Sequence, residues 1–145
     1  MAPATRWRTV SAMSRTKGQA GEREVAAIIR ALTGHDVRRR VRQHLADADL
    51  AGLPGWSVEC KRYRTVTPGL IAGWWAQTVS QAHHAHALPV LFYRADRAGW
   101  RCVWPADLHA SPKTKAIRPG FEHTLNAEPS TWWALVRRLG QHGDG

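Results

Sequence analysis

The sequence predicts an α/β fold in which a mixed central β-sheet is flanked by helices. Three observations lead to this expectation. An amphipathic helical pattern precedes a group of short strand-like segments, a second helical segment follows the strongest of these strands, and a continuous apolar run comes directly after that helix. The predicted order is helix, three strands, helix, two strands and helix, which is typical of α/β domains. With 145 residues, 43% of them hydrophobic, the chain has the size of one such domain.

The first helix is expected to begin near Gly18. Four apolar side chains share the i, i+3, i+4, i+7 spacing of one helix face: Val25, Ile28, Ile29 and Leu32. Gly34 follows them as a residue that commonly ends a helix. Residues 1–17 show no apolar period and carry four basic side chains: Arg6, Arg8, Arg15 and Lys17. We therefore expect a flexible basic arm at 1–17 and a single domain at 18–145.

Three strand-like segments follow the first helix. Residues 35–43 place arginines between valines, and residues 47–55 form a short segment that ends in a Pro-Gly turn. Residues 56–63, WSVECKRY, form the strongest segment, because successive side chains of a strand point to opposite faces. One predicted face carries Trp56, Val58, Cys60 and Arg62, and the other carries Ser57, Glu59, Lys61 and Tyr63.

The second half of the chain continues the succession of helices and strands. A helix is predicted at 68–87, with proline in its first turn. The apolar run at 89–94 is typical of a buried strand, and 99–105 is expected to return antiparallel to it. Residues 111–129 are predicted to be a loop. The final helix is expected to begin at Ser130 as its N-cap.

The charge is strongly positive. A net charge of +10, with 21 Lys and Arg against 11 Asp and Glu, indicates a polyanionic partner, nucleic acid before an anionic membrane surface. No apolar run approaches the roughly 18 residues that span a membrane, and the N-terminus lacks the apolar region of a secretion signal. Two cysteines do not make a disulfide framework, so we expect a protein of the reducing cytoplasm. No glycine pattern indicates a small-molecule cofactor.

Acidic residues and one lysine gather at the strongest strand. Glu59 and Lys61 are two residues apart and so face the same side, and the turn at 54–55 lets Asp49 lie opposite Glu59 in a hairpin. Two adjacent carboxylates are tolerated when a hard divalent cation lies between them. A lysine beside them can stabilise charge on an attacked phosphate, and Glu22 can reach the same sheet edge. This pattern indicates a metal-dependent nuclease, although a single E-x-K is also common as a surface charge pair.

Four motifs then occur in a characteristic order: KGQAGEREV at 17–25, Asp49-Leu50, VECK at 58–61, and a helix with Trp74, Trp75 and Gln77 before PVL at 89–91. Over residues 17–104 the chain resembles the archaeal-type Holliday junction resolvase branch of the PD-(D/E)XK nuclease superfamily, and its later part also resembles phage PD-(D/E)XK proteins. Two features depart from the pattern. Ala48 stands where proline usually precedes the aspartate, and the gap between Asp49 and Glu59 is short.

The resemblance implies a restriction-endonuclease-like fold, a DNA endonuclease activity and a role for each matching residue. The metal, Mg²⁺ or alternatively Mn²⁺, would be bound by Asp49, Glu59, the backbone carbonyl of Cys60, and Glu22. Lys61 would orient or activate the attacking water, and Gln77 would support Lys61 or a phosphate. Seven arginines would line the DNA-facing rim: Arg23, Arg38, Arg39, Arg40, Arg42, Arg62 and Arg64. The other interpretation of the run at 38–42 is a solvated strand.

The expected substrate is branched DNA such as a Holliday junction, which places the protein in DNA recombination and repair. Because a junction has two-fold symmetry, we expect a homodimer, with the aromatic-rich C-terminal helix as its candidate interface. One alternative is a phage-type nuclease that acts on DNA ends, flaps or nicks. The other is a non-catalytic DNA-binding module with a nuclease fold, which the presence of all four residues Glu22, Asp49, Glu59 and Lys61 disfavours.

Histidines and tryptophans allow further interpretations. The cluster of His83, His84 and His86 invites a zinc site, but it has no neighbouring cysteine, so a solvated helix end is expected. Core positions are expected for Cys60, Cys102, Trp56, Trp74, Trp104 and one of Trp132 and Trp133. Trp7 and Trp100 are candidates for stacking on DNA bases, with core packing as the default.

Overall fold

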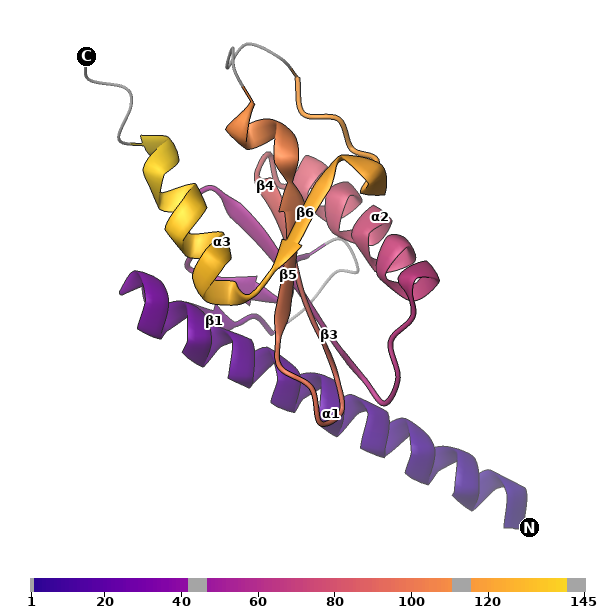
Figure 1. Ribbon diagram of the computed structural model, residues 1–145. Helices are drawn as coiled ribbons and strands as arrows, with labels where there is room; N and C mark the ends of the chain where they lie inside the picture. The colour runs from indigo at the N-terminus through magenta and orange to yellow at the C-terminus, as the bar shows by residue number, and fades with distance from the viewer. Residues whose placement is uncertain (1, 42–46, 111–115, 141–145) are drawn as a thin grey trace.

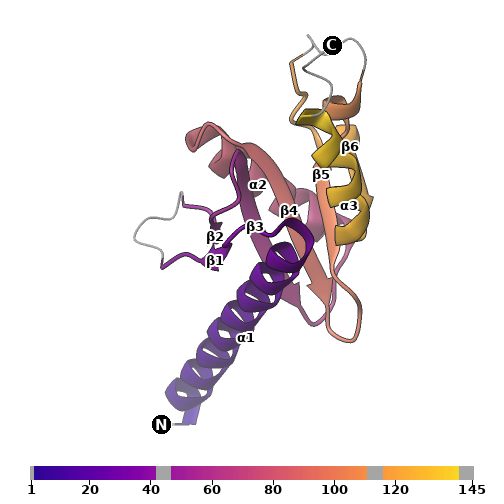
Figure 2. The ribbon, with the colours of Figure 1, turned by 90° about the vertical axis from the view of Figure 1, so that its left-hand side faces the viewer.

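The computed structural model describes residues 2–41, 47–110 and 116–140, and the side chains from residue 17 onward within these ranges. One six-stranded sheet has the strand order β1-β2-β3-β4-β5-β6. Helices α1 and α3 cover one face of the sheet, and α2 covers the other (Figures 1 and 2). The predicted α/β fold, a mixed sheet flanked by helices, is therefore confirmed.

The helices are α1 (Ala2–Thr33), α2 (Pro68–His84) and α3 (Pro129–Val136), with short 3-10 helices at Ala106–His109, Phe121–His123 and Arg137–Gly140. The strands are β1 (Arg38–Arg39), β2 (Leu50–Ala51), β3 (Trp56–Tyr63), β4 (Leu88–Ala95), β5 (Arg101–Pro105) and β6 (Thr124–Ala127). Only β3 and β4 pair in parallel, with α2 as the crossover between them, and every other neighbouring pair is antiparallel.

Helix α1 begins at Ala2 and not near Gly18, so most of the segment predicted to be a flexible arm is helical. Pro3 fits the first turn, where its missing N–H would have no partner in the helix, and the Ala, Arg, Met and Lys residues that follow favour helix. The N-terminal half of α1 extends beyond the sheet (Figure 1). The predicted end is confirmed, because Gly34 adopts φ +77° and its N–H donates to the Arg30 carbonyl at 2.9 Å.

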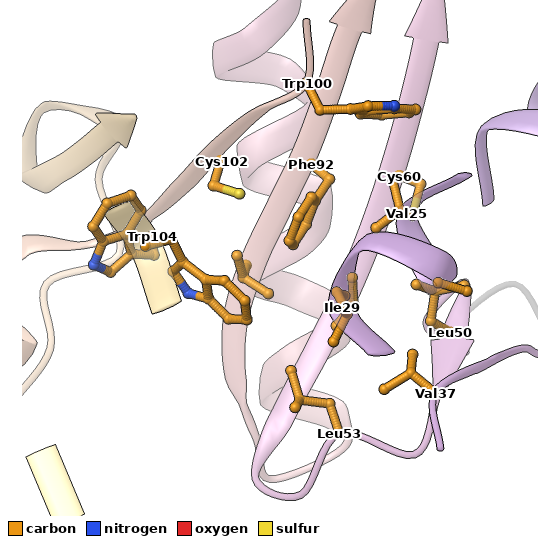
Figure 3. Close-up of a cluster of buried hydrophobic side chains, with 14 of the residues drawn as sticks. Val25, Ile29, Val37, Leu50, Leu53, Cys60, Phe92, Trp100, Cys102 and Trp104 are labelled. Carbon is orange, nitrogen blue, oxygen red and sulfur yellow. The ribbon is translucent and has the colours of Figure 1, made fainter. Parts of the chain in front are cut away.

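The larger core lies between the sheet and the pair α1 and α3. Val25 and Ile29 of α1 pack there with Cys60 and Phe92, and Cys102 lies next to them (Figure 3). Both cysteines are buried and free, as predicted. Burial raises the pKa of each thiol well above its ordinary value.

Trp100 is not exposed for stacking on DNA. It is buried in the larger core, and its indole N–H donates to Glu24 Oε2 at 2.9 Å. The default expectation of core packing is therefore the correct one for this tryptophan. Trp74, Trp104 and Trp132 are buried as predicted, and Trp56 is half-buried against the core. The side chain of Trp7 lies outside the described residues.

Two boundaries differ from the expectation. The predicted loop at 111–129 contains β6, which pairs antiparallel with β5 from Cys102↔Ala127 to Pro105↔Thr124. Four residues are too few for a clear alternating pattern, so the available partner edge of β5 decides this strand. The N-cap of α3 is Glu128, without a side-chain cap hydrogen bond, and not Ser130. Pro129 takes the first helical position, where its fixed φ suits a helix start.

Helix α3 belongs to the core of its own chain. Trp132 is fully buried, with its ring 5.5 Å from those of Trp56 and Phe92, and Val136 is buried beside it. The apolar face of this helix, which was the candidate dimer interface, is thus largely covered within the monomer. Trp133, Leu135 and Leu139 also pack against this core.

Replacing Trp132 by alanine should therefore lower the free energy of unfolding by about 3–5 kcal/mol, the usual cost of deleting a large core side chain. Chemical denaturation would measure it, with Thr131→Ala, an exposed position on the same helix, as the control. A dimer interface would instead show little loss of monomer stability and a concentration-dependent loss of the dimer.

Candidate active site

Glu59 and Lys61 lie on the sheet face that α2 covers. The parallel register pairs Glu59 with Leu91 and Lys61 with Tyr93 on β4. Leu91 and Tyr93 belong to the apolar cluster around Trp75 of α2, and paired residues point to the same side of a sheet. The alternation predicted for 56–63 is confirmed.

Asp49 lies where the hairpin was expected to place it. Leu50 pairs with Val58, so the next antiparallel position sets Asp49 opposite Glu59. The backbone N–H of Asp49 donates to the Val58 carbonyl at 3.1 Å, and its carboxylate Oδ2 accepts from the backbone N–H of Cys60 at 2.8 Å. Asp49 is 0% exposed and Glu59 is 1% exposed, so the two carboxylates are held out of solvent at neighbouring positions.

Glu22 approaches from α1, on the opposite side of the sheet. It is 8% exposed, and Arg39 Nε of β1 donates to its Oε2 at 2.6 Å. This ion pair ties α1 to the edge hairpin beside the candidate site. It also compensates the charge of Arg39, which was predicted to contact phosphate.

The negative charges of three carboxylates act on the thiol of Cys60. Its pKa is raised first by burial, then by the negative charges of Asp49, Glu59 and Glu22. The strand residue between Glu59 and Lys61 is therefore within electrostatic range of all three acidic side chains. Asp49 and Glu59 lie next to each other at the middle of β3, whereas Glu22 lies on the α1 side of the sheet, paired with Arg39.

Lys61 completes the group. Its Nζ lies 3.5 Å from Glu59 Oε1, and its side chain is 19% exposed, whereas that of Glu59 is 1% exposed. A half-buried ammonium group thus lies next to a buried carboxylate, and such a fixed positive charge is able to stabilise negative charge that develops on a substrate.

The donor set fits a hard divalent cation. Carboxylate oxygens of Asp49 and Glu59 are the ligands that Mg²⁺ prefers, and Mg²⁺ commonly uses one or two carboxylates and keeps several waters. Within 2–41, 47–110 and 116–140, no three His, Cys, Asp or Glu side chains are grouped closely enough to hold a metal ion. The chemistry of the site therefore suits a cation that retains water ligands, as Mg²⁺ and Mn²⁺ do.

The predicted rim arginines fall into two groups. Arg23, Arg40 and Arg64 are exposed. Arg38 is exposed as well, and its Nε donates to Asp36 at 3.1 Å. Arg62 instead faces the α1 side of the sheet, where its Nη1 donates to Glu24 Oε1 at 3.1 Å. Arg42 lies outside the described residues.

The salt-bridge cluster around Glu24 explains the position of Arg62. Arg94 also donates to Glu24, at 2.9 Å, and Lys17 donates to Asp96 at 2.6 Å. The Lys17 hydrogen bond is the main cause that lowers the pKa of Asp96. These contacts join α1 to the ends of β3 and β4, which indicates a structural role for Arg62.

The model of a family described as "phage putative PDDEXK endonuclease" matches residues 13–126, a span that contains Glu22, Asp49, Glu59 and Lys61. The chain belongs to this family. Membership confirms the resemblance to the PD-(D/E)XK superfamily and identifies the protein as a nuclease of that type.

One solved structure similar to this PDDEXK nuclease is Hjc, a Holliday junction resolvase from the archaeal hyperthermophile Archaeoglobus fulgidus. The two chains are 14% identical, with a TM-score of 0.48, and the match covers 79% of this chain and 98% of the other. Comparison with curated proteins finds no significant match.

Helix α2 carries two glutamines, and the resemblance assigned the role of supporting Lys61 or a phosphate to Gln77. Gln77 is exposed on α2, whereas Gln81, one turn later, is buried. The sequence pattern contained both residues, but apolar side chains occupy several sides of α2 and left its inward face undefined. Gln81 is thus a buried polar residue near β3 that sequence reasoning missed.

The histidine cluster lies at the C-terminal end of α2, where His83, His84 and His86 are all exposed. Their exposure agrees with the expected solvated helix end. Among the described helices, none is both long and apolar enough to cross a membrane.

Proposed function

We propose that this PDDEXK nuclease is a divalent-metal-dependent DNA endonuclease that hydrolyses phosphodiester bonds in branched DNA. One observation carries the proposal: Asp49, directly before β2, and Glu59 of β3 are buried next to each other, with Lys61 Nζ 3.5 Å from Glu59 Oε1. A chain with net charge +10 that concentrates buried carboxylates at one place has the charge distribution of a metal-dependent nuclease.

Hydrolysis needs an activated water and stabilisation of the charge that builds on the phosphate. A divalent cation supplies both when bound, because it lowers the pKa of a water ligand and neutralises phosphate oxygens. Asp49 and Glu59 would hold that cation, with the Cys60 carbonyl as a further donor, and Glu22, which is paired with Arg39, would complete the acidic site through water or a second cation. Lys61 orients the water and stabilises the phosphate charge while one P–O bond forms to the water oxygen and another breaks to the leaving sugar oxygen.

Branched DNA is the proposed substrate for two reasons. The KGQAGEREV motif in α1 resembles that of junction resolvases, and the described residues form one layered unit without a second unit for reading a long base sequence. Recognition of DNA shape suits such a unit. Paired cuts across a junction require two sites, so we propose a homodimer whose interface is not the buried face of α3.

A cleavage assay tests the proposed function. Four-way, flap, nicked and linear DNA with shared arm sequences would be incubated with purified protein in Mg²⁺, Mn²⁺ or EDTA. The expected result is paired symmetric nicks in four-way DNA with either metal and none in EDTA, with a dimer seen by light scattering.

Three other outcomes would replace the proposal. Cleavage confined to flaps, nicks or ends by a monomer would establish the end-processing alternative. Metal-independent cleavage would remove the metal role. Binding without cleavage of any DNA would make the protein a non-catalytic module.

The exposed arginines of the proposed DNA-facing rim predict a strong dependence of DNA affinity on salt concentration. Each neutralised phosphate contributes a slope of about −0.9 to log affinity against log salt on duplex DNA. Arg40→Gln should make the slope shallower by about that amount, because Arg40 is exposed beside the hairpin that carries Asp49. Arg39→Gln should change the slope less, since Arg39 is paired with Glu22.

Fluorescence anisotropy over a salt series measures these slopes, with Arg137→Gln, an exposed arginine outside the proposed rim, as the control. Equal slopes for the wild type and Arg40→Gln would remove Arg40 from the DNA contact.

A further inference from the structure

Gln81 is a buried amide that the hydrolysis described above does not use. It is 4% exposed, and among the described residues neither its Oε1 nor its Nε2 has a hydrogen-bond partner. Buried polar side chains are nearly always hydrogen-bonded, because an unpartnered buried amide destabilises the folded state. An apolar side chain would fill this position at lower cost, so the amide needs an explanation.

The direction of Gln81 follows from its neighbours on α2. Trp74, about two turns earlier on the same side of the helix, contacts the Tyr63 ring of β3 with centroids 4.8 Å apart. The other edge of α2 carries Trp75 and Val79, which line a cavity with Pro105 near β5. Gln81 therefore lies on the edge of α2 that faces β3.

The position of Gln81 along the length of β3 follows from the geometry of helix and strand. Seven residues of helix, from Trp74 to Gln81, advance about 10.5 Å at 1.5 Å per residue. Because α2 runs antiparallel to β3, that distance corresponds to about three strand residues back from Tyr63 at roughly 3.3 Å each. Gln81 is therefore level with the stretch between Lys61 and Glu59, whose side chains point to the same face.

The side chains between α2 and the sheet form an apolar region and a polar region. Over β4 and β5 it is apolar, with Trp74 and Trp75 packed on Leu91 and Val103. Over β3 the residues on the α2 face include the buried polar side chains of Ser57 and Glu59. Gln81 adds a donor and an acceptor to this polar side, next to the candidate site.

We propose that Gln81 is a positioning residue for the Glu59–Lys61 pair, an inference that rests on the proposed function. In the catalytically competent state its amide N–H donates to the Glu59 carboxylate, and its Oε1 accepts from Lys61 Nζ. A carboxamide can do both at once, whereas the direct separation of 3.5 Å between Lys61 and Glu59 is long for a hydrogen bond. Gln81 thereby fixes the two groups that act on cation and phosphate.

Gln81→Met tests this role, because methionine keeps the volume and removes both hydrogen-bonding atoms. We expect kcat to fall at least about tenfold, the size typical of losing an outer-shell contact, with KM unchanged. The denaturation midpoint without metal and DNA should stay equal or rise, since an unpartnered amide is removed. Gln81→Glu keeps an acceptor but loses the donor, and should also lose kcat.

Two further variants complete the design. Thr131→Met, at an exposed position of α3, is the neutral control, and Gln77→Met tests the exposed glutamine that the sequence motif indicated. A Gln81→Met protein with the kcat of Thr131→Met would overturn the inference, as would a kcat loss matched by a lower denaturation midpoint or a larger loss in Gln77→Met. Those results require an active wild type, whereas a wild type that cleaves no DNA would remove the proposed function and this inference together.

Discussion

Replacement of Glu59 by glutamine should abolish metal-dependent DNA cleavage, with a loss of at least about 10²–10³-fold, while DNA binding stays equal or becomes tighter. The substitution keeps the shape of a side chain that is 1% exposed, so the fold should be retained. It removes one negative charge that, in the proposed function, holds the cation and repels phosphate. Single-turnover cleavage with Mg²⁺, together with anisotropy binding in EDTA, measures the two effects separately.

Glu122→Gln is the matched control, because Glu122 is an exposed glutamate of the 3-10 helix before β6. The Glu122→Gln protein should cleave DNA at the wild-type rate. Asp49→Asn should behave as Glu59→Gln does, since an asparagine carbonyl can still accept the Cys60 N–H that Asp49 accepts at 2.8 Å. Wild-type cleavage by Glu59→Gln would reject the metal site.

The second large effect is expected at Lys61. Lys61→Met should lower the cleavage rate by roughly 10²-fold or more, because one preorganised charge at the transition state is lost. Arginine should not restore the rate, since its planar guanidinium is larger than the ammonium that lies 3.5 Å from Glu59 Oε1. Rapid-quench kinetics at saturating DNA would isolate this step.

Lys17→Met provides the control for Lys61, because Lys17 is also ion-paired with a carboxylate, Asp96, in the Glu24 cluster. A fully active Lys61→Met would mean that Glu59 and Lys61 form only a structural charge pair. Loss of activity in Lys17→Met to the same extent would point to a general effect of charge on DNA binding.

The strand that carries the site could be predicted because its alternation is strong. The boundaries Trp56–Tyr63, the face shared by Glu59 and Lys61 and the opposite position of Asp49 all followed from period-two patterning and a Pro-Gly turn. The start of α2 was equally clear, although the helix ends at His84 and not at Ala87 as predicted. Its first turn has proline after the N-cap Thr67, whose side chain accepts from the Leu70 N–H.

The remaining differences come from tertiary contacts that local patterns do not contain. The inward face of α2 depends on which sheet strands it meets, so Gln77 and Gln81 could not be distinguished from sequence. The pairing of Arg39 with Glu22 and of Arg62 with Glu24 joins residues far apart in the chain. Strand β6 exists because β5 offers an edge to a short segment with weak preference of its own.

The buried thiols of Cys60 and Cys102 provide a natural probe of opening motions. Both lie in the core between the sheet and α1, where burial blocks the access of alkylating reagents. Their raised pKa also leaves little of the reactive thiolate at neutral pH, so two separate effects slow alkylation. Modification should therefore follow the opening of that core, and mass spectrometry can time each cysteine separately. If Cys60 were labelled more slowly with Mg²⁺ present while Cys102 kept its rate, cation binding would be seen to stabilise the strand of the active site, in a measurement that needs no DNA.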